Sequence, residues 1–322
     1  MNTKSYINAL ITSDWKSGIA VFLVALPLCL GIALASGAPL LAGLVAGIVG
    51  GIIVSLLSGS ELSVSGPAAG LTIIVATAIT ELGSFPGFLV AVILAGVIQI
   101  ALGLLKLGKI GGFFPSSVIR GMLVAIGIVI ILKQIPHAFG YDKDYEGDLA
   151  FLQTDSENTF SELFQLIGHV QLGSIIITLL SLFILIAWTK VEFLKKIKLV
   201  PPALIAVIVS ISLNEFFIIS GSSFSIKSDH LVSLPVPSSI EEFKSIFILP
   251  NFSALANTKV WVIGVTIAVV ASIETLLCVE AADRMDVQKR FTDTNVELKA
   301  QGIGNILSSL LGGLPMTSVV VR

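Results

Sequence analysis

The chain alternates between long apolar runs and shorter polar segments. Most runs are close to the roughly 20 residues that an α-helix needs to cross a bilayer. The pattern predicts membrane-spanning helices at 17–36, 40–57, 87–107, 118–135, 172–188, 202–220 and 260–279, and shorter helices at 66–79 and 300–311. We therefore expect an all-α polytopic membrane protein, with residues 1–16 as an N-terminal segment and residues 17–322 as a transmembrane domain.

Composition excludes a water-soluble globular protein. Hydrophobic residues make up 55% of the chain and charged residues only 12%, whereas soluble proteins carry about 25% charged residues. The mean hydropathy is +0.99. With a net charge of −2 and no basic arm, the chain gives no indication of a nucleic-acid partner. Its expected surroundings are the lipid bilayer of the plasma (inner) membrane.

The distribution of Lys and Arg predicts the orientation, because cytoplasmic loops are enriched in these residues. With the N-terminus inside, the outer segments hold Lys133, Lys143, Lys227, Lys244 and Lys259, and the rest of the 19 basic residues except Arg322 fall inside. The outer segments 142–162 and 221–258 are long and rich in acidic residues. The N-terminus is expected in the cytoplasm.

Two segments interrupt the helical pattern in the same way. Residues 63–70 and 312–318 each place glycine, proline and hydroxyl residues before an apolar run. Proline suits the first turn of a helix, and a helix that starts within the membrane presents free N–H groups and a positive dipole end, which attract anions. Paired interrupted helices mark the binding site in transporters built from inverted repeats. The alternative is that these residues only loosen the packing of helices.

Isolated charges within the apolar runs are the remaining candidates. Glu274 falls in the middle of the run 260–279, where a carboxylate must be protonated, paired or directed into a polar cavity. Arg322 follows the second interrupted segment and could attract an anion. No nucleophile–base pair and no second buried carboxylate is expected beside Glu274, so the sequence does not predict an enzyme. It shows no metal-binding spacing either, and no cofactor is expected beyond a coupling ion.

Four segments of this chain resemble the SulP family of anion transporters. The strongest is NVELKAQGIGN at 295–305, followed by GGLPMTS at 312–318. Residues 107–121, 131–136 and 65–67 resemble the family in the same order along the chain, and Pro27 resembles the break in its first helix. The resemblance implies a fold of seven plus seven helices in inverted repeat, of which this chain holds the first repeat and the start of the second.

The resemblance also implies a site and a mechanism. A small inorganic anion would lie between the N-termini of half-helices three and ten, and a core domain would move in an elevator-like way against a gate domain, usually in a homodimer. The matching positions are Ser65, Gly66, Pro67, Ala68 and Ala69 in half-helix three, and Thr317, Ser318, Val319 and Arg322 in half-helix ten. Glu274 and Cys278 match the positions that bind the coupling ion, sodium, in the bicarbonate-carrying branch.

Some positions depart from that branch. Cys278 and Val320 stand where it has hydroxyl groups, so the oxygen ligands for sodium are incomplete and proton coupling through Glu274 is the alternative. The pattern around Pro27 favours bicarbonate over sulfate. Two other functions stay open, namely a transporter of the same fold for a dicarboxylate or other organic anion, and a non-functional fragment.

By this resemblance, we expect residues 17–322 to be an incomplete transporter domain that reaches only the first two turns of the tenth helix and includes no STAS domain. We expect residues 317–322 to be poorly fixed, because so short a segment cannot propagate a helix. We also expect the 322-residue chain alone to give no saturable anion uptake.

Overall fold

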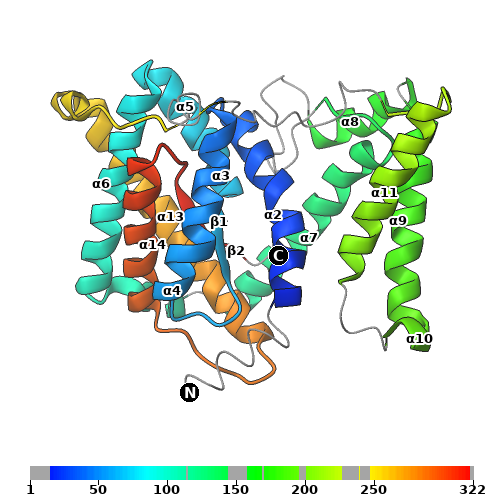
Figure 1. The fold of residues 1–322 in the computed structure, drawn as a ribbon. Coiled ribbons are helices and arrows are strands. Elements are labelled where there is room, and N and C mark those ends of the chain that lie inside the picture. The colour runs from blue at the N-terminus through cyan, green and yellow to red at the C-terminus, as the bar shows by residue number, and fades with distance from the viewer. Residues whose placement is uncertain are drawn as a thin grey trace. The chain divides into compact units, whose positions relative to one another are not determined.

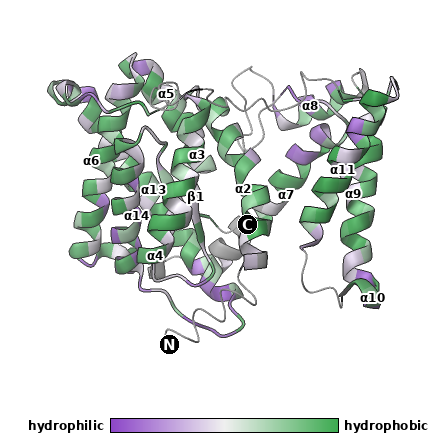
Figure 2. Cartoon of the chain, viewed as in Figure 1, coloured by the Kyte–Doolittle hydropathy of each residue, from purple (hydrophilic) through white to green (hydrophobic). Residues whose placement is uncertain are grey.

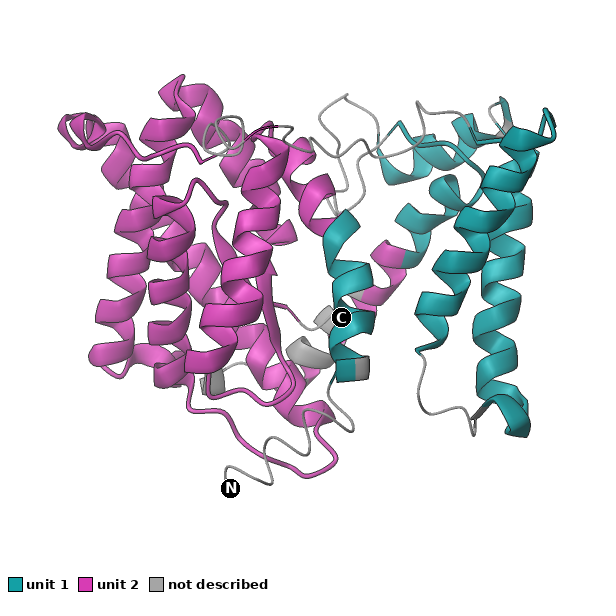
Figure 3. Ribbon diagram, viewed as in Figure 1, with its two compact units in different colours: residues 1–27, 131–143, 155–233 teal, residues 28–130, 144–154, 234–322 magenta. Residues whose placement is uncertain are grey.

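The computed structural model describes residues 15–113, 115–143, 158–168, 170–195, 201–226, 239 and 247–319. The chain forms two compact units (Figure 3): unit 1 comprises residues 1–27, 131–143 and 155–233, and unit 2 comprises residues 28–130, 144–154 and 234–322. The helices α2 (Trp15–Ala35) and α7 (Ser116–Ala138) each contribute residues to both units. Helix α2 continues through Pro27, which we expected to interrupt it.

Unit 1 is built around two long apolar helices, α9 (Leu172–Lys190) and α11 (Pro202–Ile219), which pack against each other. The hydroxyls of Ser181 and Ser210 join them at 2.8 Å. Only 11% of the residues in the most apolar stretch of each helix are buried, and hydrophobic residues cover both helices (Figure 2). Such exposed apolar surfaces suit contact with lipid.

The short helices α8 (Thr159–Gln165) and α10 (Glu192–Lys195) complete unit 1. Helix α8 is tied to the end of α7 by two polar contacts. Lys133 forms a buried ion pair with Glu162 at 3.9 Å, and Tyr141 donates a hydrogen bond to Gln165 at 2.9 Å. Pairing with a carboxylate allows Lys133 to be buried.

Unit 2 combines helices with a short two-stranded ribbon (Figure 1). A continuous helical segment runs through α3 (Leu40–Val49), the π-helical turn η2 (Gly50–Val54) and α4 (Ser55–Leu57). Strand β1 (Val64–Pro67) leads through the 3₁₀ turn η3 (Ala69–Leu71) into α5 (Thr72–Leu82) and α6 (Phe85–Leu104). The 3₁₀ turn η4 (Leu107–Phe113) follows α6. After unit 1 the chain re-enters unit 2 and forms the 3₁₀ turn η7 (Phe252–Ala256), α13 (Thr258–Met285), α14 (Thr294–Leu310) and strand β2 (Met316–Val319).

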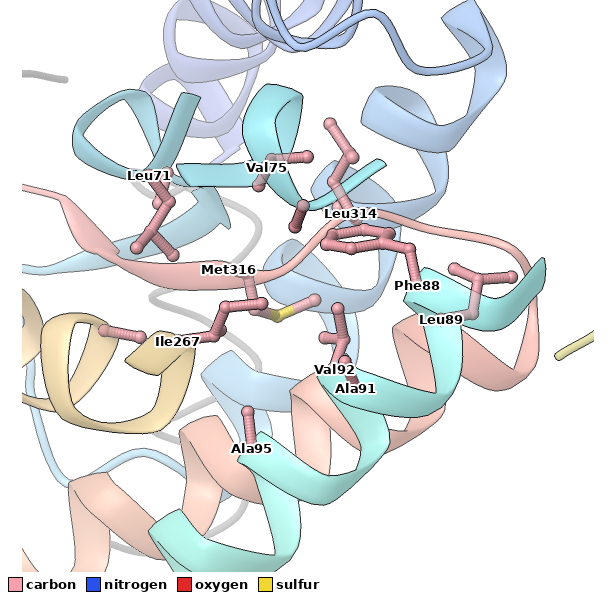
Figure 4. Packing of buried hydrophobic residues seen from close by; sticks show 14 of the residues in the cluster. Leu71, Val75, Phe88, Leu89, Ala91, Val92, Ala95, Ile267, Leu314 and Met316 are labelled. Carbon is pink, nitrogen blue, oxygen red and sulfur yellow. The ribbon is translucent and has the colours of Figure 1, made fainter. Parts of the chain in front are cut away.

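The core of unit 2 lies where α5, α6 and α13 meet the segment that contains β2. Phe88 and Val92 of α6 point toward Leu314 and Met316 (Figure 4), and these residues and the neighbouring Leu89 are each at most 1% exposed. Leu71, Val75 and Ile267 close the same cluster. The hydrophobic core therefore packs directly on β2, which fixes this strand within unit 2.

The predicted fold class is confirmed. Six helices among the described residues are long and apolar enough to cross a membrane, and each overlaps one of the predicted spans. Several boundaries were wrong, including the end of the span predicted at residue 279, since α13 continues to Met285. Helix three was predicted from residue 66, but residues 64–67 form a strand. The last helix was predicted from residue 300, but it begins at Thr294, where the Asp293 side chain accepts hydrogen bonds from Asn295 and Val296 N–H.

Candidate functional site

The two interrupted segments lie side by side as an antiparallel ribbon. Strand β1 pairs with β2 so that Ser65 is opposite Ser318 and Gly66 is opposite Thr317. Because directly opposed residues project to the same face, the two serines share one face, and Thr317 lies on the other. The expectation that residues 317–319 are poorly fixed was wrong, since pairing with β1 replaces a helix as their source of hydrogen bonds.

Pro67 fits into strand β1 because it stands at a position whose N–H would not bond to β2. Both the N–H and the C=O of Met316, the residue opposite Pro67, bond to the side chain of Asn305 and so point away from β1. The missing N–H of the proline therefore leaves no ladder bond unmade. Pro67 ends the strand instead of opening a helix, which corrects its predicted role in the first turn of helix three.

A helix begins directly after β1. Ala68, the residue before η3, is in an extended conformation and gives the helix no side-chain cap. The helical segment 69–82 is short and apolar. The N–H groups of its first turn, at Ala69 and Gly70, have no acceptor within the helix. The Gly70 N–H donates to the carboxylate of Glu274, so Ala69 is the donor that this helix start offers to an anion.

The carboxyl group of Glu274 lies against this helix start. A Cβ added at Gly70 would lie 3.0 Å from both carboxylate oxygens, so glycine permits the approach. The carboxyl group also interacts with the side chain of Thr317 on β2. Glu274 on α13 therefore contacts both the helix start at Gly70 and strand β2 at Thr317.

Several polar atoms at this place are shielded from solvent and have no hydrogen-bond partner among the described residues. They are Oε2 of Glu274, Oγ1 of Thr317 and Oγ of Ser318. Ser318 lies on the opposite face of the ribbon from Thr317. Buried polar atoms are nearly always hydrogen-bonded, so the oxygens of Glu274 and Thr317, whose side chains lie beside each other, mark this face of the ribbon as the candidate binding site. Their neighbour Thr275 is satisfied, because its Oγ1 accepts from the Ser318 N–H at 3.4 Å.

The remaining predicted site residues fall in three places. Cys278 is buried on α13, four residues beyond Glu274 and therefore on the same face of the helix. Val319 is half-buried at the end of β2. Arg322 and Val320 lie outside the described residues.

Sequence reasoning missed a second buried carboxylate. Glu297 on α14 is 0% exposed, as are Gln301 and Asn305 one and two turns further on. Glu297 accepts hydrogen bonds from Ser58 Oγ and from Gln301 Nε2. The spacing of the three polar residues, i, i+4 and i+8, could have indicated a polar face on this helix.

A separate polar cluster closes the end of α13. Arg290 donates from Nε to Asp286 at 2.7 Å and pairs with Glu61 at 3.4 Å. The hydrogen bond from Arg290 lowers the pKa of Asp286 to about 2. Asp283 accepts from the N–H and the hydroxyl of Thr292. This cluster is satisfied internally and shapes the turn between α13 and α14.

Comparison with known proteins identifies relatives of the whole segment. "Putative sulfate transporter YvdB" of Bacillus subtilis is 30% identical over 324 residues, which cover 99% of this chain and 56% of that protein. "Bicarbonate transporter BicA" of Picosynechococcus is 27% identical over 312 residues, covering 94% of this chain and 51% of that protein. The chain thus spans about half the length of the curated relatives it matches.

Solved structures show the same architecture. The transmembrane domain of a cyanobacterial bicarbonate transporter BicA superposes with a TM-score of 0.62 at 26% identity, covering 96% of this chain and 74% of that one. The structure of SLC26A9, at 19% identity and a TM-score of 0.56, shares the fold. The model of the sulfate permease family matches residues 11–322. The chain therefore belongs to the sulfate permease family, as its motifs indicated.

Proposed function

We propose that this chain belongs to a secondary active transporter of a small inorganic anion, bicarbonate or sulfate. One observation carries the proposal: residues about 250 positions apart form a buried ribbon that places an uncapped helix start beside a carboxylate with an orphaned oxygen. The relatives named as sulfate and bicarbonate transporters support this choice of substrate. The same fold could also serve an organic anion such as a dicarboxylate, which remains the alternative.

In this proposal the anion binds at the start of the helical segment 69–82. The N–H group of Ala69 donates to it, and the positive end of the helix dipole adds attraction. Ser65, Gly66, Pro67 and Ala68 shape the strand that leads to this donor. Thr317, Ser318 and Val319 supply the opposite strand, and Arg322 would add a positive charge beyond it.

The position of Glu274 provides a reason for ion coupling. Two like charges about 4 Å apart repel by about 4 kcal/mol at an effective dielectric constant of about 20. An anion at the helix start and an ionised Glu274 would therefore disfavour each other. Binding of a proton or a sodium ion at Glu274 removes the repulsion, so the cation and the anion bind together and move together.

The chemistry near Glu274 fits either cation. A proton needs only the carboxylate. Sodium prefers oxygen ligands, and the hydroxyl of Thr317 lies beside the carboxylate, whereas the thiol of Cys278 is a poor ligand for this ion. We infer that Glu274 is the coupling residue and that the identity of the cation is decided by its neighbours on β2.

All described residues of the site lie in unit 2. A site confined to one unit can be carried as a body, which supports an elevator-like movement of unit 2 against unit 1. We further propose that the transporter works as a homodimer in the plasma membrane with a cytoplasmic N-terminus, from the distribution of basic residues given above.

The test replaces the coupling carboxylate. A chimera that continues this chain with the remaining residues of its Bacillus subtilis relative supplies the length that the relatives have. In proteoliposomes, Glu274→Gln in this chimera should abolish bicarbonate or sulfate accumulation driven by a proton or sodium gradient, with the protein still inserted. The matched control is Glu280→Gln on the same helix, where the carboxylate pairs with Arg284 near the helix end.

The control should transport as the unmodified chimera does. Gradient-driven uptake that survives Glu274→Gln would contradict the coupling role. If anion accumulation depends on the sodium gradient and not on the pH gradient, sodium is the coupling ion. If it depends on the pH gradient and not on sodium, the proton is the coupling ion. A chimera that takes up neither anion while it accumulates a dicarboxylate would show that the proposed substrate is wrong.

A further inference from the structure

Helix α14 carries a polar stripe that faces the protein interior. Glu297, Gln301 and Asn305 follow one another at intervals of four residues, so they lie on the same face of the helix, and none of them is exposed. Polar side chains inside a membrane domain are costly unless they are paired. Each of the three makes hydrogen bonds to parts of unit 2 far away in sequence or within the stripe itself.

Gln301 connects the stripe to β1. Its Nε2 donates to Ser65 Oγ at 2.6 Å and to Glu297 Oε1 at 2.9 Å. Glu297 in turn accepts from Ser58, which lies on the segment before β1. The buried carboxylate of Glu297 thereby fixes the amide of Gln301, and this amide in turn fixes the side chain of Ser65.

Asn305 connects the stripe to β2. Its Oδ1 accepts from the Met316 N–H at 2.7 Å, and its Nδ2 donates to the Met316 C=O at 3.2 Å. A neighbouring strand would make the same pair of bonds, so the side chain of Asn305 takes the place of a third strand. A further bond from Nδ2 to Gln99 Oε1 at 2.7 Å fixes the direction of the amide.

The ribbon needs such support because of its size. Each strand has four residues, and a two-stranded ribbon is marginally stable without further packing. Core packing around Met316 supports β2 from one side, whereas the two amides of α14 contact both strands. A small change at α14 would therefore shift the strands relative to Glu274 on α13.

We propose that Gln301 and Asn305 are positioning residues of the anion site. Helix α14 holds β1 through Gln301 and β2 through Asn305, and so sets the distance between the helix start at Ala69 and the coupling carboxylate. The anion-binding part of this inference rests on the proposed function, whereas the support of the ribbon does not. The two parts are tested by different measurements.

The first measurement is hydrogen exchange of the 322-residue chain in nanodiscs. Gln301→Met keeps the length of the side chain and removes its hydrogen bonds, and Asn305→Leu does the same at β2. Either change should speed exchange of the ribbon amides at least tenfold, while amides in the middle of α6 and α13 keep their rates. The control is Ser309→Ala, since Ser309 is equally buried on α14 and its hydroxyl has no hydrogen-bond partner among the described residues.

Unchanged exchange in the ribbon, or equal acceleration throughout unit 2, would overturn the supporting role. Should Asn305→Leu fail to insert, Asn305→Asp keeps the acceptor for the Met316 N–H and loses the donors. Its expected exchange rates lie between those of the wild type and those of Gln301→Met.

The second measurement is the KM for bicarbonate and sulfate uptake by the chimera. Gln301→Met should raise KM about tenfold with a smaller effect on kcat, and it should have no further effect in a Ser65→Ala background. An equal effect in both backgrounds, or an unchanged KM, would show that Gln301 does not act through Ser65. No uptake of either anion by the unmodified chimera would instead overturn the proposed function, and the positioning role with it.

Discussion

Replacing Gly96 with alanine should destabilise unit 2, because this residue lies at the closest approach of α6 and α14. A Cβ at Gly96 would lie 2.6 Å from the carbonyl oxygen of Gly302, and a Cβ at Gly302 would lie 2.6 Å from that of Gly96. Ordinary contact begins at 3.4 Å, so the backbones would have to separate by about 0.8 Å. Two helix backbones cannot yield as the end of a flexible side chain can.

The magnitude follows from two opposing effects. Overpacking of a close-packed interior costs about 1–3 kcal/mol. Replacing glycine by alanine in a helix recovers about 0.4–1 kcal/mol through the unfolded chain. The expected net loss for Gly96→Ala is about 1–2 kcal/mol. Because Gly302 directly follows Gln301, the displacement would also disturb the support of the ribbon.

The assay is reversible unfolding in mixed micelles with increasing dodecyl sulfate, followed by circular dichroism. The control is Gly51→Ala in η2, where an added Cβ meets no heavy atom within 4 Å among the described residues. This variant should be as stable as the wild type or slightly more stable. Equal stability of Gly96→Ala and Gly51→Ala would refute the argument that the close approach of α6 and α14 requires glycine.

Three further predictions concern other parts of the chain. Gly70→Ala brings a Cβ within 3.0 Å of the carboxylate oxygens of Glu274. It should raise the KM for the coupling cation at least tenfold in uptake assays, with little loss of stability, and an unchanged cation KM would contradict this. The pKa of Asp286, lowered to about 2 by Arg290, contributes stability above pH 4 that is lost as the pH falls towards 2. The melting temperature of Asp286→Asn should therefore fall less than that of the wild type between pH 4 and pH 2. An equal fall in both proteins would contradict this. Cysteine labelling from outside should reach Ser156→Cys but not Lys195→Cys, and the reverse pattern would invert the orientation.

The membrane spans were predictable because a single helix satisfies its own backbone in lipid. Hydropathy alone then locates it. The run predicted at 40–57 coincides with the helical segment from Leu40 to Leu57, and the run at 202–220 differs by one residue from α11. In each case the evidence for the element is contained within about 20 consecutive residues. No knowledge of a partner was needed.

The ribbon was not predictable in the same way. Val64–Pro67 and Met316–Val319 each contain residues that suit the start of a helix, and only their pairing makes them strands. The pairing joins positions more than 240 residues apart, which no local pattern records. The family resemblance placed both segments at one site, and in this respect the sequence was informative. It assigned them to helix starts because their composition, taken one segment at a time, favours that conformation.

The polar stripe of α14 shows why the site was only half predicted. Read as a span, α14 was given only its apolar part from residue 300, because its first turns carry polar residues such as Asn295, Glu297 and Lys299. Its burial depends on a hydrogen bond to Gln301, and the position of Gln301 depends on Ser65, 236 residues earlier. A buried polar residue can thus be recognised from sequence only when its partners are known. The same dependence makes the stripe a sensitive part of the molecule. Loss of either amide removes a hydrogen-bond partner from one helix and one strand, namely Glu297 and Ser65 for Gln301, and Gln99 and Met316 for Asn305, at about 1–3 kcal/mol for each buried group left unsatisfied.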